Sequence, residues 1–107
     1  MIKIYVAGPY TQGDTALNVA RAIEMAESIW MLDCIPFVPH LTHFWHLIHQ
    51  HSYEEWLSLD MVWLEACDGL FRLSGPSIGA DREVQRMIEL DRPVFEHLEG
   101  LKAWLGE

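Results

Sequence analysis

Cysteine and positive charge are both scarce in this chain. Its two cysteines, Cys34 and Cys67, have no motif spacing, so we expect two buried thiols in a reducing cytoplasm and no disulfide framework. The sequence has seven Lys and Arg residues and sixteen Asp and Glu residues, which gives a net charge of −9. This charge repels phosphate backbones, which argues against nucleic acid or an anionic membrane as a partner. A small anionic ligand stays open, since backbone N–H groups can hold a phosphate.

Long apolar runs, repeats and linkers are also missing. No segment approaches the ~20 apolar residues that a membrane-spanning helix needs. The first residues enter a strand pattern directly, without the apolar stretch of a signal peptide, so we expect a cytoplasmic protein. The 107 residues predict a single domain, 1–107. Half of them are hydrophobic and five are Trp, which favours burial of some apolar surface between subunits.

Strand and helix patterns alternate along the chain, which predicts a parallel sheet with helices on both faces. A first helix, capped by Asp14 or Thr15 and running to about Leu32, carries an apolar stripe at positions 19, 22, 23, 26, 29 and 30. Prolines around Ile35–Val38 indicate an edge strand or a strand end. The predicted strands are 2–7, 35–38, 68–73 and 93–95, and the predicted helices are 14–32, 53–66, 79–90 and 98–105.

Residues 40–52 fit no regular element well and hold five of the six histidines. Histidines at 40, 43, 46 and 49 recur every three residues, so a metal site, a pocket wall and simple packing are all open. As pocket walls, His43 and Trp45 would contact a flat heterocycle. Ser52 is expected to cap the next helix, on which Trp56 and Trp63 favour a core or subunit contact.

Two loops follow predicted strands, where open α/β sheets bind their ligands. Gly8-Pro9-Tyr10 follows the first strand, and the segment from Ser74 to Gly79 precedes a helix whose free N–H groups suit an anion. An ordinary turn capped by Ser77 is the alternative. Glu83, one turn inside that helix, is either a solvated acid or a nucleophile toward a sugar carbon. Asp60 and His43 are both candidates for a second proton-handling group.

The same segments, taken in order, resemble the nucleoside 2-deoxyribosyltransferase superfamily. The matching blocks are Tyr5 to Tyr10, Asp60 to Asp68, and the Ser-x-Gly-x-x-x-Glu pattern from Ser77 to Glu83. The resemblance is greatest to a poorly characterised bacterial and phage branch of unknown function, in which a histidine run like 40–46 is typical.

This resemblance implies a flavodoxin-like or Rossmann-like three-layer αβα sandwich with a mostly parallel sheet of four or five strands. It implies cleavage or transfer at the N-glycosidic bond of a nucleoside or its 5′-monophosphate, without metal or organic cofactor. Glu83 and Asp60 would be catalytic, and a homodimer or homotetramer is expected. The substrate would contact Gly8, Pro9, Tyr10, His43, Trp45, Ser77 and Gly79. A non-catalytic nucleotide-binding module on the same fold is the alternative function.

Overall fold

Four short strands form one sheet in the computed structural model, which describes residues 1–106. The strand order is β2-β1-β3-β4 and every neighbouring pair is parallel, with Tyr5 aligned between Phe37 and Leu70. Along the chain the elements are β1 (Lys3–Ala7), α1 (Thr15–Trp30), β2 (Ile35–Phe37), the 3-10 helix η1 (Pro39–Leu41), α2 (Thr42–Ile48), α3 (Tyr53–Glu65), β3 (Gly69–Arg72), α4 (Ile78–Glu89), β4 (Val94–Phe95) and α5 (Leu98–Leu105).

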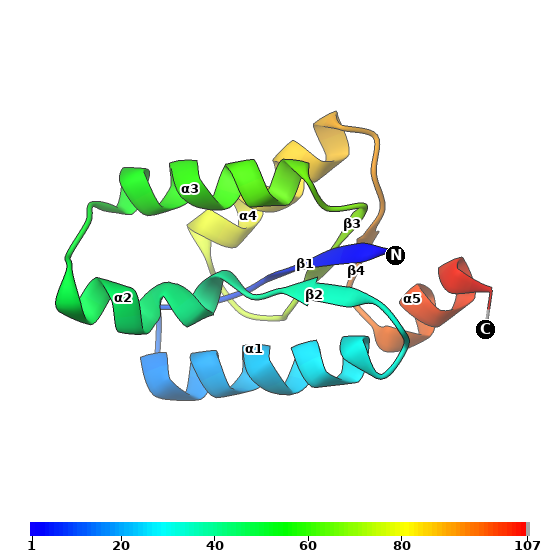
Figure 1. Ribbon diagram of the computed structural model, residues 1–107, viewed down its shortest axis with the longest axis horizontal. Coiled ribbons are helices and arrows are strands. Elements are labelled where there is room, and N and C mark those ends of the chain that lie inside the picture. Colours follow the sequence, from blue (N-terminus) through cyan, green and yellow to red (C-terminus); the bar gives the residue numbers. More distant parts are fainter. Residues whose placement is uncertain (107) are drawn as a thin grey trace.

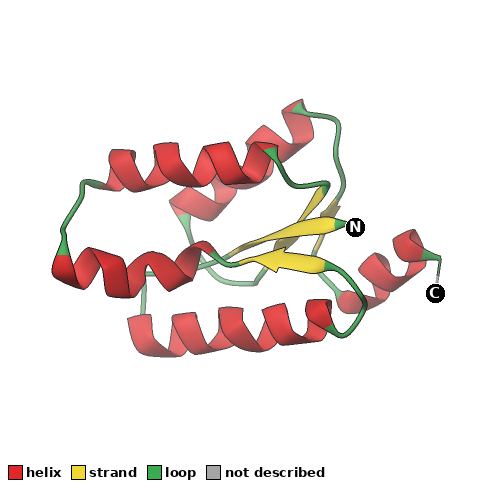
Figure 2. Cartoon of the chain, viewed as in Figure 1, coloured by secondary structure: helices red, strands yellow, loops and turns green. Residues whose placement is uncertain are grey.

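The alternation of side chains along β1 produces two separate cores. Ile4 and Val6 point to one face of the sheet, where they pack with α1 and α5. Tyr5 and Ala7 point to the other face and pack with α3 and α4. Helices therefore cover both faces of the sheet, as Figures 1 and 2 show. The predicted flavodoxin-like three-layer αβα sandwich with a parallel sheet is confirmed, and the sheet has four strands among the described residues.

Residues 39–48 correct one sequence-based prediction, because they form η1 and α2 instead of an irregular segment. Pro39 supplies the first residue of η1, where its missing N–H is not needed. α2 buries no residue, and its large apolar side chains Phe44, Trp45, Leu47 and Ile48 are exposed. Figure 1 shows α2 extending beyond the end of β2, between the layer of α3 and the layer of α1.

The ends of the elements agree with most of the predicted signals. The Asp14 side chain caps α1 by accepting a hydrogen bond from the N–H of Leu17, and Ser52 forms a capping box with Glu55 at the start of α3. β2 is an edge strand, as its prolines predict.

The apolar stripe of α1 is narrower than expected. Ile23 and Trp30 are 43% and 56% exposed, while Val19, Ala22 and Ile29 are buried. The outer positions of the predicted stripe therefore face solvent instead of the core. The two cysteines are buried and form no disulfide. None of the helices within residues 1–106 has the length and apolar character to cross a membrane.

Candidate active site

A cavity of about 530 Å³ opens at the carboxyl end of β1, and four segments of the chain line it. These segments are the loop after β1, the η1–α2 segment, one face of α3 and the first turns of α4. The strand order places β1 and β3 at the centre of the sheet, so their two following loops meet at this edge.

Glu83 is a buried carboxyl group in this cavity. Ser77 fixes the start of α4, since its Oγ accepts a hydrogen bond from the N–H of Ala80 at 3.1 Å. Glu83 follows one turn later and is only 6% exposed. Tyr5, fully buried on β1, donates its phenolic O–H to Glu83 Oε2. The helix thus inserts one carboxyl group into the molecule and the central strand orients it.

Burial raises the pKa of the Glu83 carboxyl to about 8. The hydrogen bond from Tyr5 lowers this pKa, while the nearby Asp60 raises it. A glutamate with a pKa in this range exchanges a proton near neutral pH, as groups in acid–base catalysis must.

Asp60, on the cavity face of α3, is the second carboxyl group of the site. Its Oδ1 is buried and has no hydrogen-bond partner among residues 1–106. Burial raises the pKa of Asp60 to about 7. Two interacting carboxyl groups with raised pKa values titrate as a pair, so one holds a proton while the other is ionised. The pair can therefore supply an acid and a nucleophile at the same pH.

The loops that bring these groups together are in direct contact. A Cβ placed on Gly75, whose φ is +114°, would lie 2.9 Å from Pro9 Cγ, and one placed on Gly8 would lie 2.8 Å from Leu73 Cβ. Arg72 ties down the second loop by donating to the carbonyl of Gly75 at 3.0 Å and to the Asp81 carboxylate at 3.1 Å. Both loops are held against each other at the floor of the cavity.

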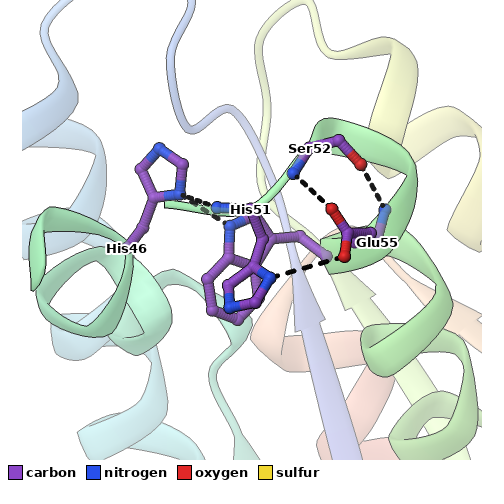
Figure 3. A network of polar contacts seen from close by, with 5 residues as sticks. His46, His51, Ser52 and Glu55 are labelled. Carbon is purple, nitrogen blue, oxygen red and sulfur yellow. Dashed lines mark hydrogen bonds and ion pairs between the residues drawn. The ribbon is translucent and has the colours of Figure 1, made fainter. Parts of the chain in front are cut away.

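Histidines and aromatic rings build the outer wall of the cavity. Buried His40 donates Nε2–H to the carbonyl of Pro9 at 3.0 Å, and its pKa is lowered, chiefly by burial. At the mouth, His46 Nδ1 accepts hydrogen bonds from the indole of Trp56 at 2.8 Å and from the backbone of His51 at 3.3 Å. Figure 3 shows this network together with the capping box of Ser52.

Six of the nine side chains or backbone positions selected from the sequence line the cavity. They are Gly8, Tyr10, Asp60, Ser77, Gly79 and Glu83. Their roles toward a substrate stay predictions, but the fold brings all six to one place from three separate parts of the chain.

The other three selected residues lie outside the cavity lining. The Pro9 carbonyl accepts the hydrogen bond from His40. His43 Nδ1 forms a hydrogen bond with the Tyr10 hydroxyl at 2.6 Å, so His43 contacts a lining residue without lining the cavity itself. Trp45 is 50% exposed and lies over a shallow hollow beside β2. No three His, Cys, Asp or Glu side chains within residues 1–106 are placed as a metal site requires.

The sequence does not indicate two residues of this site, Trp56 and Tyr5. Of the three alternatives for the histidine run, the pocket wall applies to His40 and His46, which line the cavity. Trp56, for which the sequence favours a core or subunit contact, lines it as well. For Tyr5, the sequence predicts a place in the first strand and no contact with Glu83. Its hydroxyl was the available signal, because a phenol in a fully buried strand needs a partner.

Comparison with known proteins places the fold and the family. Seven solved chains match this one. They include a 2-desoxiribosyltransferase from Leishmania mexicana, with a TM-score of 0.65 and 17% identity over 88% of this chain. The chain spans 62% of the length of that structure, and at this identity the match shows the fold alone. No curated protein sequence matches. A family model described as "Domain of unknown function (DUF7768)" matches residues 2–97, and the chain therefore belongs to that family.

Proposed function

We propose that this protein cleaves or exchanges the N-glycosidic bond of a nucleoside or nucleoside 5′-monophosphate. One observation carries the proposal: a buried Glu83, hydrogen-bonded by Tyr5, shares a cavity with a second carboxyl group, Asp60. The deoxyribosyltransferase fold gives this pair the setting that the reaction needs.

The reactive form of the pair carries its proton on Asp60. With pKa values of about 7 for Asp60 and about 8 for Glu83, this is the less populated of the two singly protonated forms. In that form, ionised Glu83 attacks C1′ of the sugar and forms a glycosyl ester as the C1′–N bond breaks. Protonated Asp60 gives its proton to the departing base, which leaves neutral. Water or a second base then attacks C1′ and gives a proton back to ionised Asp60, while the ester bond breaks and Glu83 is released as the carboxylate. Gly8 and Tyr10 would face the sugar, while the N–H groups behind Ser77 and Gly79 would hold a 5′-phosphate when one is present.

The test is base release from a panel of nucleosides and 5′-monophosphates, followed by chromatography. Glu83→Gln should reduce release by about a thousandfold or more, as loss of a nucleophile does. Glu89→Gln is the matched control, since Glu89 lies on the same helix with a half-exposed side chain that pairs with Arg86. Equal base release by wild type and Glu83→Gln would show that Glu83 is not the nucleophile.

A second candidate function is nucleotide binding without turnover. The pKa of about 8 leaves Glu83 largely protonated at neutral pH, which suits a binding group better than a nucleophile. Calorimetry that finds tight nucleotide binding, combined with no base release from any substrate between pH 6 and about 9.5, would favour this function.

We also propose a homodimer or homotetramer. Large apolar side chains are exposed on α2 and α3 beside the cavity, namely Phe44, Trp45, Leu47, Ile48, Val62 and Trp63. A second subunit over this surface would remove them from water and close the cavity mouth. Light scattering coupled to size-exclusion chromatography tests this, and a monomer at micromolar concentration would refute it.

A further inference from the structure

His46 on α2 and Trp56 on α3 fix each other at the mouth of the cavity. The indole Nε1–H of Trp56 donates to His46 Nδ1 at 2.8 Å, and the two rings meet at an interplanar angle of 67°. Trp45 and His51 pack edge-on around the same indole, each with a ring centroid 5.1 Å away. The position of the His46 ring is therefore set by a cluster from two helices.

The hydrogen bonds also determine which nitrogen of His46 carries the proton. Nδ1 receives two N–H donors, from Trp56 and from the backbone of His51, so it must present a lone pair to both. The ring proton of His46 is consequently on Nε2, which makes that nitrogen a fixed donor. In Figure 3, this second ring nitrogen of His46 lies on the side of the ring away from the dashed bonds.

The cluster stands at a suitable distance from the proposed reaction centre. Trp56 and Asp60 are four residues apart on α3 and both line the cavity, so they are separated by about 6 Å along the helix axis. A sugar whose C1′ lies between Asp60 and Glu83 would project its base over a comparable distance. The far edge of the base would then reach His46.

We propose that His46 selects the base, by donating Nε2–H to an exocyclic oxygen, and that Trp56 is the positioning residue that holds it. This inference rests on the proposed function. An oxo base such as hypoxanthine or uracil offers an acceptor to this donor. The contrast is at C6 of a purine and C4 of a pyrimidine, where adenine and cytosine carry an amino group in place of the oxygen, so that two donors would face each other. The substrate class is then an oxo-base nucleoside or nucleotide.

Binding of free bases tests the selection without requiring turnover. Calorimetry should show hypoxanthine binding about tenfold or more tightly than adenine to wild type, with the same order for uracil over cytosine. His46→Phe should reduce this preference to within about twofold. His49→Phe is the matched control, since exposed His49 ends the same helix outside the cavity lining, and it should keep the preference.

Two further variants separate selection from folding. His46→Gln retains an amide donor near the position of Nε2 and should restore part of the preference for the oxo base. Trp56→Phe keeps an aromatic ring but removes the donor to Nδ1. Nitrogen NMR should find His46 protonated on Nε2 in wild type and a larger share of the other tautomer in Trp56→Phe.

The inference is overturned by equal binding of oxo and amino bases to wild type, by absence of base binding, or by a preference that survives in His46→Phe. Failure of the proposed function gives a different result. It appears as base release that does not depend on Glu83, and the binding preference measured by calorimetry is unaffected by it.

Discussion

Removing the hydroxyl group of Tyr5 should impair the ionisation of Glu83. Tyr5 is fully buried and donates to the Glu83 carboxylate, so Tyr5→Phe deletes one hydrogen bond and leaves the packing of the ring on β1 unchanged. That hydrogen bond opposes the effect of burial, because it stabilises the ionised form of Glu83. The variant should therefore have a higher pKa at Glu83 than the wild-type value of about 8.

The size of the shift follows from the strength of the bond. A hydrogen bond to a charged group contributes about 1.5–3 kcal/mol, and one pKa unit corresponds to about 1.4 kcal/mol. The pKa of Glu83 in Tyr5→Phe should thus rise by about one to two units. At pH 7 the ionised fraction would fall from about one tenth to between about one hundredth and one thousandth.

Two measurements check this shift. Carbon NMR of the Glu83 side chain follows the titration directly, and the acidic limb of the pH dependence of kcat/KM for base release should move upward by the same amount. Tyr53→Phe is the control, because Tyr53 also lines the cavity but contacts Arg82 instead. A Glu83 titration that is unchanged, or that moves downward, in Tyr5→Phe would refute the reasoning.

Substitutions at three further positions have defined outcomes. Glu83→Gln should flatten the pH dependence of stability. The folded state raises the pKa of Glu83 from 4.5 to about 8, so the protonated Glu83 side chain stabilises the fold at low pH, and this contribution is lost as pH rises toward 8. Denaturant unfolding measures the unfolding free energy at pH 6.5 and at pH 8.5. The decrease between these two pH values should be about 2 kcal/mol smaller in the variant than in wild type, and equal decreases would contradict the raised pKa. Gly8→Ala should lower the unfolding free energy by about 1–3 kcal/mol, since its Cβ would lie 2.8 Å from Leu73 Cβ. An unchanged denaturation midpoint would show that the backbone at the end of β1 shifts to accommodate the methyl group. Ser77→Ala should cost about 1 kcal/mol by removing the cap on Ala80, while Ser77→Gly should cost only a few tenths, and equal losses would show that the cap contributes little.

The sheet and its flanking helices were predictable because their signals are local. Apolar β-branched residues and a Gly-Pro break mark β1, and Asp14 and Ser52 mark the starts of α1 and α3. Alternation of strands with helices then leaves few possible arrangements. The sequence does not indicate α2, because the helix has only seven residues, fewer than a periodic pattern needs to identify a helix.

The site was predictable only in part, for a physical reason that differs between residues. Glu83 is indicated by its place one turn after a Gly- and Ser-containing loop that is predicted to suit an anion, at the ligand edge of the sheet. Its partner Tyr5 is 78 positions away, and nothing local indicates that the two meet. The pairing of His46 with Trp56 depends on the angle between α2 and α3, which tertiary packing sets and spacing does not encode.

Because Gly75 contacts Pro9, the loop after β1 and the loop after β3 pack against each other at the base of the cavity. Arg72 fixes the second loop to β3, and the contact keeps either loop from moving toward the other. Among the walls of the cavity, α2 has no buried side chain, so we expect it to move most when the cavity widens to admit a bulky molecule. Amide hydrogens of α2 should consequently exchange with solvent much faster than those of β1, and a bound ligand should slow the exchange of α2 most.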